Sequence, residues 1–182
     1  MSPQSTFFLA LVALILTTTT TTSSHLFPTG PEQRSHLHFF IHDKISGPNA
    51  TAVKVTSTPH PIPSASGLHF ASVFVVDDLI TVGPDPASKV LGRARGLYSV
   101  SSLTGSDLYF SIHAVFTGGI YKGSSLAVLA RDPIFEAVRE LPIVGGTGYF
   151  RLARGFAFMK THLFNVKTGN AVLEIDAYIL HH

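Results

Sequence analysis

The sequence has no cysteine and no tryptophan among its 182 residues, and only two methionines. Without cysteine the chain cannot form disulfides, thiolate metal ligands, a cysteine nucleophile or an iron–sulfur cluster. Charged residues are also scarce, at 13%, which is about half the usual share. The net charge of +2 comes without any cluster of basic residues, so the composition does not indicate nucleic-acid binding.

Long apolar runs are missing as well, apart from the ten residues Phe7–Leu16. This run is too short to span a bilayer and has the length of a signal-peptide core. We therefore expect a signal peptide over residues 1–24, a flexible lead-in over 25–35 and a secreted domain over 36–182, with no membrane span; an N-terminal anchor is the alternative. Secretion exposes the sequon at Asn49 to glycosylation.

The remaining sequence reads as short strands separated by turns rich in Gly, Pro, Ser and Asp. One segment, Pro133–Glu140, is expected to form a short helical turn. Because strands and helices do not alternate, a parallel sheet is not indicated. The predicted fold is all-β, an eight-stranded antiparallel β-barrel, with a β-sandwich as the alternative. The eight expected strands are Leu37–Asp43, Ala52–Ser57, Leu68–Asp77, Val90–Val100, Leu108–Phe116, Ser124–Arg131, Gly148–Thr161 and Ala171–Leu180.

Two acidic residues fall at the ends of apolar strand faces. In a strand, residues two apart share a face, which places Asp43 in line with Leu37, Phe39 and Ile41. The same rule places Asp132 in line with the apolar residues 126, 128 and 130. Each acid is either a cap on an exposed strand end or a member of a site. If both reach one cavity, loss of solvent and mutual repulsion raise at least one pKa and create a proton donor.

Two other strand faces carry small residues. Gly92, Ala94 and Gly96 lead to Tyr98 on one face, and a similar row leads to Thr161 on another. Small inward side chains either pack tightly against large partners or line a ligand cavity. In the second case Tyr98 and Thr161 bring hydroxyl groups into that cavity.

The histidines do not predict a metal site. His36, His38 and His42 share a strand face, but the first and last lie about 20 Å apart along a strand and cannot bind one ion together. His36 and His38 could do so only with further ligands from elsewhere. No nucleotide-binding, hydrolase or zinc-protease motif is present. We therefore expect no metal and no cofactor.

Several motifs together resemble the plant dirigent family. They are RELPIVGGTGYFRLARG at Arg139–Gly155, His42-Asp43 followed by the Asn49 sequon, VDDLIT at 76–81 and GRARGLY at 92–98. The likeness covers roughly residues 37–182. It implies an eight-stranded barrel, usually a homotrimer, secreted to the apoplast.

The resemblance also implies a function. Dirigent proteins hold phenoxy radicals or quinone methides derived from phenylpropanoids and fix the stereochemistry of their products, lignans or pterocarpans among them. Asp43, Asp132, Arg139 and Tyr98 match the family's active-site positions, and Thr161 matches a substrate-binding threonine. The partners are then a small aromatic substrate and, for radical coupling, a separate oxidase such as a laccase or peroxidase.

The chain also departs from the family pattern. Arg95 stands where Gln is common, and the cysteine pair of many lignan-forming members is absent. These departures favour members similar to pterocarpan synthase, which dehydrate an isoflavanol through a quinone methide. A passive barrel that binds small apolar ligands remains the alternative from another functional class. The two inward carboxylates distinguish the dirigent hypothesis from the passive-binder hypothesis, because a passive binder has little need of them.

Overall fold

The computed structural model describes residues 30–56, 62–63 and 67–182. The chain divides after Pro31, and the second unit, Glu32–His182, holds every strand among the described residues. The signal peptide expected over 1–24 lies outside the described residues, as do residues 25–29 of the expected lead-in. In the described part of the chain, no helix is long and apolar enough to cross a membrane.

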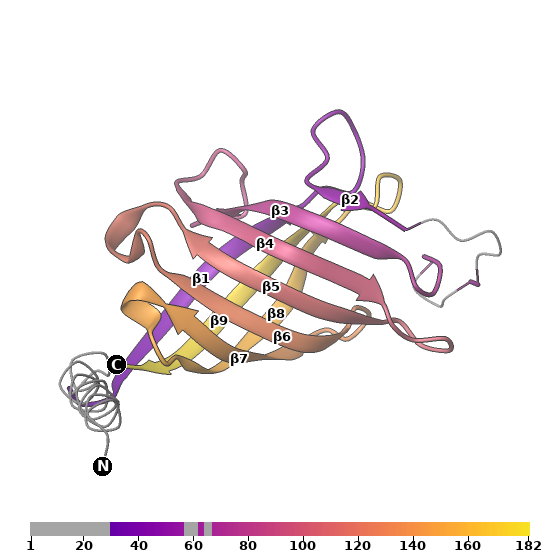
Figure 1. Cartoon of the computed structure of the whole chain (residues 1–182). Helices are drawn as coiled ribbons and strands as arrows, with labels where there is room; N and C mark the ends of the chain where they lie inside the picture. The colour runs from indigo at the N-terminus through magenta and orange to yellow at the C-terminus, as the bar shows by residue number, and fades with distance from the viewer. Residues whose placement is uncertain (1–29, 57–61, 64–66) are drawn as a thin grey trace, which may run out of the picture. The chain divides into compact units, whose positions relative to one another are not determined.

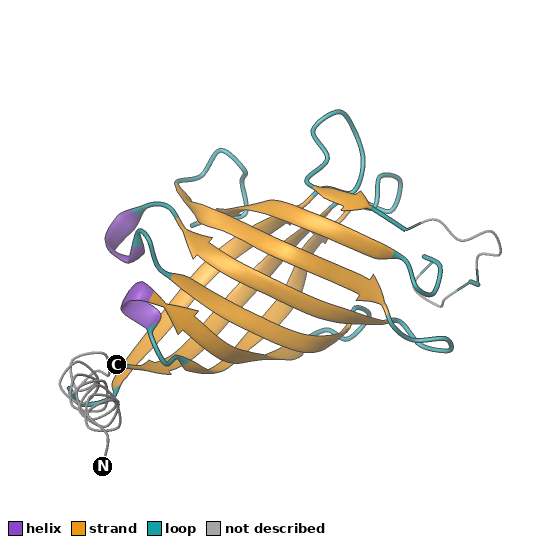
Figure 2. Ribbon diagram, viewed as in Figure 1, coloured by secondary structure: helices purple, strands orange, loops and turns teal. Residues whose placement is uncertain are grey.

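The second unit is built almost entirely of strands (Figure 2). Its only helical pieces among the described residues are two 3-10 turns, η1 (Gly119–Tyr121) and η2 (Gly148–Phe150). The first strand begins inside the segment expected to be a lead-in. The strands are β1 (Gln33–Asp43), β2 (Ala52–Lys54), β3 (Val73–Thr81), β4 (Val90–Val100), β5 (Asp107–Phe116), β6 (Ser125–Pro133), β7 (Arg139–Thr147), β8 (Arg154–Phe164) and β9 (Ala171–His181).

The sheet closes on itself because β1 has a partner on each side. It pairs with β9 along its whole length, from Gln33 to Asp43, and with β3 through the short run from Phe40 to His42. The hydrogen-bonded order is β1-β9-β8-β7-β6-β5-β4-β3, every pair antiparallel, and β2 adds to β3 beside β1 (Figure 1). This confirms the predicted eight-stranded antiparallel barrel.

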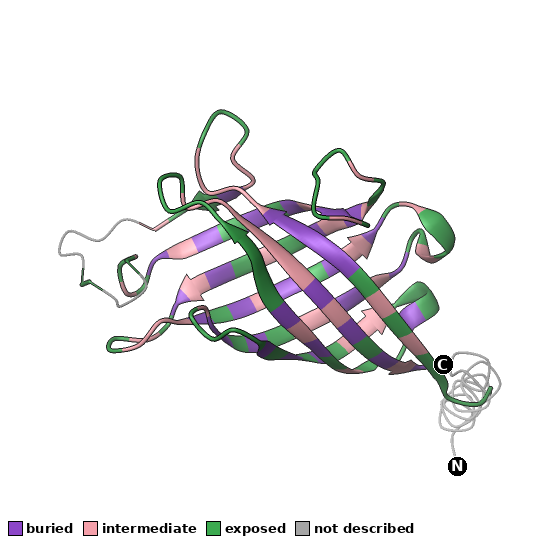
Figure 3. Cartoon of the chain, turned by 180° about the vertical axis from the view of Figure 1, so that it is seen from behind, coloured by how far each residue is buried: buried purple, intermediate pink, exposed green. Residues whose placement is uncertain are grey.

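Alternation of buried and exposed residues turns one face of each strand inward. In β5, Leu108, Phe110 and Ile112 point into the barrel, while Tyr109 on the opposite face is exposed. The same alternation appears as bands along neighbouring strands (Figure 3). The interior is thus a packed apolar core, in which Ile80 and Met159 have no exposed surface.

The strand count is correct, but the set of strands differs in two places. The sequence pattern predicted a helical turn at Pro133–Glu140 and no strand between it and Gly148, whereas β7 begins at Arg139. Pro142, Gly145 and Gly146 in this strand are residues that sequence rules assign to turns. The expected barrel strand at Ala52–Ser57 is instead the three-residue β2.

Aromatic side chains fill one end of the barrel. Phe150 from η2 is fully buried and contacts the rings of Phe116, Tyr121 and His181. Tyr149 packs against the same group. Because this end is filled, an interior site must lie towards the other end.

Glycines allow two pairs of strands to approach closely. Gly96 in β4 has a φ of +151°, and a Cβ atom there would lie 2.1 Å from the Ser111 carbonyl oxygen. Gly155 in β8 has a φ of +154° and the same relation to the Tyr178 carbonyl oxygen. Both the torsion and the lack of space exclude a side chain at these two places.

Replacement of Gly96 tests this constraint. We expect Gly96→Ala to lower the free energy of unfolding by about 2–4 kcal/mol, because the added Cβ meets backbone that cannot move away. Gly145→Ala is the matched control, since its Cβ would lie 3.9 Å from the Ala127 Cβ atom. Urea unfolding of both variants measures the difference. Equal stability of the two variants would contradict the argument.

Candidate functional site

Polar interior side chains gather at the barrel end opposite the aromatic cluster, hereafter the mouth. Because neighbouring strands are antiparallel, β1, β4, β6 and β8 end at the mouth, and β3, β5, β7 and β9 begin there. Asp43 and Arg139 are the last residue of β1 and the first residue of β7. Tyr98, Asp132 and Thr161 lie within the last residues of β4, β6 and β8. All five predicted site residues therefore lie towards one end.

Asp43 and Tyr98 share a small cavity with a residue that was not predicted, Asp78 of β3. The cavity measures about 20 Å³, which is room for roughly one water molecule. The rest of its lining is apolar and comprises Ile41, Val76, Ala94, Phe110, Ile112 and Leu173.

The apolar lining raises the pKa of the Asp43 carboxyl to about 7. Burial is the largest cause, and the negative charge of Asp78 adds to it, whereas a hydrogen bond from the Tyr98 hydroxyl acts in the opposite direction. The pKa of the Tyr98 hydroxyl is itself raised above its usual value by burial and by the two acids. At neutral pH Asp43 is therefore divided between its protonated and ionised forms, and Tyr98 remains a hydrogen-bond donor.

Asp78 is a second acid in the same cavity. Burial raises its pKa to about 6, while a hydrogen bond donated by the Thr51 hydroxyl lowers it. Its neighbour Asp77 points to the outer face, where Arg93 and Arg95 bind it. The parity rule that selected Asp43 also selects Asp78, since Phe74, Val76, Asp78 and Ile80 share the buried face of β3.

A separate group joins Asp132, Arg139 and Thr161. The Asp132 and Arg139 side chains are both almost fully buried, and Asp132 Oδ1 lies 3.4 Å from Arg139 Nη1. Arg139 Nη2 donates a hydrogen bond of 2.9 Å to Thr161 Oγ1, which is exposed at the mouth. Burial raises the pKa of Asp132 to about 6, although the Arg139 charge lowers it. The guanidinium thus only partly offsets the loss of solvent around this carboxyl.

Unsatisfied polar atoms concentrate in these two groups. In the described part of the chain, four buried side-chain atoms have no hydrogen-bond partner, and three are Asp43 Oδ1, Asp132 Oδ1 and Arg139 Nε. The fourth is His181 Nδ1, in the aromatic cluster. Buried polar atoms without partners are rare, and each one calls for an explanation. A ligand with hydroxyl groups would supply the missing partners.

The barrel wall is interrupted beside the second group. Within the described strands, the β6–β7 ladder ends at Val128 and Ile143, so the mouth-side parts of β6 and β7 do not pair. The Asp132–Arg139 ion pair joins the two strands beyond that point. A groove of about 440 Å³ lies against this part of the wall. Its lining is Ser101, Asp107, Leu108, Tyr109, Leu129, Ala130, Arg131 and Pro142.

The two groups are separate but neighbouring parts of the mouth interior. Leu173, which lines the small cavity, pairs directly with Thr161 of the second group. The structure thus brings Asp43 and Tyr98 together and Asp132, Arg139 and Thr161 together, but not all five into one cavity. Asn49 is exposed in a turn of the loop between β1 and β2, at the mouth end.

Comparisons with known proteins show which family this chain resembles. The family model described as "Dirigent-like protein" matches residues 34–180. The chain belongs to the dirigent family. Dirigent protein 21 of Arabidopsis thaliana is 44% identical over 151 residues, which cover 83% of this chain and 79% of that protein. Pterocarpan synthase 1 of Glycine max is 39% identical over 186 residues, covering 98% of this chain and 99% of that protein.

Solved structures of family members share the fold. The structure of the pterocarpan synthase dirigent protein GePTS1 superimposes with a TM-score of 0.81 at 37% sequence identity. It covers 89% of this chain and 98% of that chain. Membership of the dirigent family and its β-barrel are therefore shown from both sequence and structure, as the sequence motifs predicted.

The raised pKa of Asp43 predicts how stability depends on pH. Between about pH 4 and pH 7 the folded protein holds a proton on Asp43 that the unfolded chain releases, so the free energy of unfolding falls as the pH rises through this range. Asp43→Asn removes the buried charge. It should therefore raise the free energy of unfolding at pH 8 by on the order of 2–4 kcal/mol, since one pKa unit corresponds to about 1.4 kcal/mol.

Urea unfolding at pH 4, 6 and 8 measures the effect. The gain should shrink towards pH 4, because the pH there is close to the ordinary Asp pKa of 3.8 and the unfolded chain also begins to hold this proton. The exposed Asp77→Asn is the control. Burial, the largest single cause, raises the pKa of this outward carboxylate, but the hydrogen bonds and charges of Arg93 and Arg95 together lower it below its usual value. An Asp43→Asn effect of the same size at every pH would contradict the assignment.

Proposed function

We propose that this dirigent protein binds a phenolic substrate at the mouth of its barrel and promotes its dehydration to a quinone methide, whose stereochemical fate the barrel then controls. One observation carries the proposal. Three interior acids, Asp43, Asp78 and Asp132, have pKa values raised to between about 6 and about 7. Acids in this range can both give and accept protons at neutral pH.

Dehydration needs one proton donor and one proton acceptor. Protonated Asp43 donates to the leaving hydroxyl of an isoflavanol-like substrate, so the carbon–oxygen bond breaks and water departs. Ionised Asp132 takes the proton of the phenol, whose electrons move into the ring, and a neutral quinone methide forms. The atoms and charges balance without any cofactor.

The neighbouring groups hold these acids in the required states. The Asp78 charge raises the pKa of Asp43 and keeps it partly protonated. The Arg139 charge favours the ionised form of Asp132 and can stabilise a phenolate. Tyr98 donates a hydrogen bond to a substrate oxygen, and Thr161, held by Arg139, positions the ring at the mouth.

The size of the cavity constrains how the substrate sits. A cavity of about 20 Å³ admits the reacting oxygen but not an aromatic ring. We infer that the ring lies at the mouth, between the two groups of polar residues, with one face against the barrel wall. Nucleophiles then reach only the other face, which fixes the stereochemistry.

A second candidate function is control of radical coupling. Phenoxy radicals made by a separate oxidase, such as a laccase or peroxidase, would occupy the same place and couple on one face. The family resemblance implies this alternative, while the likeness to a pterocarpan synthase, 39% identical over 98% of this chain, supports dehydration. Incubation with an isoflavanol alone, and with coniferyl alcohol plus an oxidase, followed by chiral chromatography, separates the two.

The proposed location and modification of the protein are based on two features of its sequence. The apolar run at 7–16 supports secretion to the apoplast, and the exposed Asn49 supports glycosylation after secretion. Assembly as a homotrimer and action on a small aromatic substrate complete the proposal. A barrel that only binds its ligand is the alternative. Full activity of the acid variants described next would favour it.

Removal of either acid tests the proposed roles. Asp43→Asn and Asp132→Asn should each lower turnover of an isoflavanol by about 10²-fold or more, as loss of a general acid or base does. The double variant should be hardly slower than the slower single one, because the acids act as a unit. Asp77→Asn is the matched control, since it removes a carboxylate from the outer face. Near-normal turnover in both single variants would sink the dehydration proposal.

The pH profile gives a second test. Turnover should be bell-shaped, with limbs near pH 6 and pH 7, because Asp132 must be ionised and Asp43 protonated. Asp78→Asn removes a charge that raises the pKa of Asp43, so the upper limb should move to lower pH by roughly one unit or less. Turnover of both proteins measured from pH 5 to 9 checks the shift. An unmoved upper limb would exclude Asp78 from this role.

A further inference from the structure

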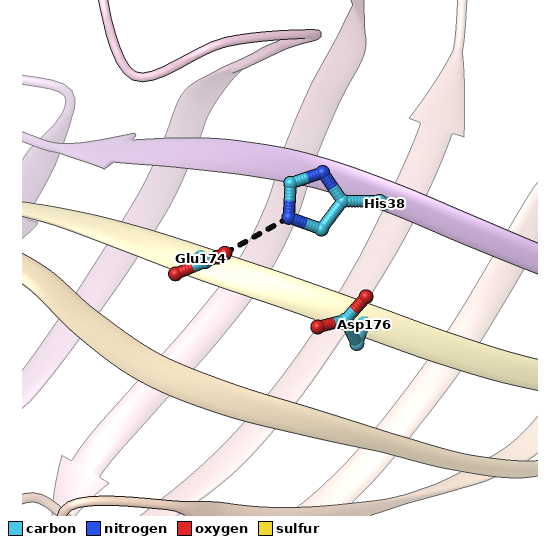
Figure 4. A group of neighbouring side chains, drawn as sticks. All are labelled: His38, Glu174 and Asp176. Atoms are coloured by element: carbon cyan, nitrogen blue, oxygen red, sulfur yellow. Dashed lines mark hydrogen bonds and ion pairs between the residues drawn. The ribbon is translucent and has the colours of Figure 1, made fainter.

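The outer face of the barrel carries a group of possible metal ligands, remote from the mouth interior. His38 on β1 and Glu174 and Asp176 on β9 offer ligand atoms that all lie within 4.8 Å of one another (Figure 4). His38 Nε2 lies 2.9 Å from Glu174 Oε1. On the same face, His36 Nε2 lies 3.2 Å from Asp176 Oδ1. Two imidazoles and two carboxylates thus alternate across one strand pair.

We propose that this face binds one Zn²⁺ ion per chain, with His38, Glu174 and Asp176 as ligands and a water molecule as the fourth. The proposal does not depend on the proposed catalytic function. The sequence predicted no metal because His36 and His38 needed further ligands from elsewhere; β9 brings two carboxylates beside them.

The strand register explains why these residues converge. His38 is paired with Asp176 and Phe40 with Glu174, so both carboxylates share the outward face with the histidines. Strands β1 and β9 pair along their whole length, which fixes the spacing of the ligands before any ion binds. A preorganised set of ligands avoids the entropy loss of assembling the site.

The distances suit zinc after a small adjustment. Zinc bonds to nitrogen and oxygen are about 2.0–2.2 Å long, so two tetrahedral ligands lie roughly 3.4 Å apart. The observed separation of 2.9 Å between His38 Nε2 and Glu174 Oε1 is that of a hydrogen bond, so these two atoms move slightly apart to admit the ion. On binding, Zn²⁺ takes the place of the shared proton, and His38 coordinates through Nε2 in the tautomer that carries its proton on Nδ1.

Charge and accessibility also favour a divalent cation. Glu174 and Asp176 together carry two negative charges, which one Zn²⁺ neutralises. The side chains of the three protein ligands are 27–42% exposed, so an ion can reach them from solvent. Mixed imidazole and carboxylate ligands favour zinc and similar first-row ions over Mg²⁺ or Ca²⁺, which prefer oxygen alone. Lys160 faces Glu174 across the β8–β9 register, and its positive charge weakens binding.

Titration calorimetry with ZnCl₂ on the full chain, after chelator treatment and in a phosphate-free buffer at pH 7.5, tests the proposal. We expect one ion per chain and a higher unfolding temperature with zinc, since a ligand of the folded state stabilises it. Excess Mg²⁺ should not displace the zinc. His38→Ala and Asp176→Asn should weaken binding by about tenfold or more, because each removes a ligand, and Lys160→Ala should tighten it.

His113→Ala is the matched control, since His113 is an exposed histidine on the outer face of β5; it should bind zinc as the unaltered protein does. If His38→Ala does not fold, His38→Gln and Glu174→Gln take its place. Absence of zinc binding in the unaltered protein would overturn the proposal. So would binding that the ligand variants leave unchanged, because the ion would then lie elsewhere.

Discussion

Closure of the sheet by β1 is the constraint on which the other features depend. Its pairing with β9 along eleven residues and with β3 through three turns one face of every barrel strand away from solvent. The apolar interior then follows, and so does the high cost of any charge within it. Closure also brings the first and last strands of the barrel together, which is what places histidines from one beside carboxylates from the other on the outside.

The same enclosure gives the acids their chemistry. Burial is the largest cause of the raised pKa of Asp43, Asp78 and Asp132 alike, so the apolar wall matters more here than any single charged neighbour. Arg139 limits the effect at Asp132, and Asp78 enlarges it at Asp43. The pKa of each acid thus depends on the sign of the neighbouring charge, which is negative beside Asp43 and positive beside Asp132. Neither acid needs a metal or cofactor to have a pKa near neutral pH.

Strand parity predicts much of this site and explains what was missed. The rule that residues two apart share a face selected Asp43, Asp132, Tyr98 and Thr161 from sequence alone. Asp78 obeys the same rule, but its neighbour Asp77 makes the pair look like a polar strand end. Strand β7 was not predicted because its proline and glycines suggest a turn, and only its partner strands impose the extended form. Which site residues lie together depends on how neighbouring strands are aligned. The alternation of faces within a single strand does not determine that alignment, so the two groups could not be predicted.

The unpaired ends of β6 and β7 act as a seam in the barrel wall. Along the longer ladders, widening the barrel would break hydrogen bonds over most of a strand. At the seam, within the described strands, it separates chiefly the Asp132 and Arg139 side chains. The circumference is therefore adjustable at this place, which lies beside a proposed reactive carboxylate.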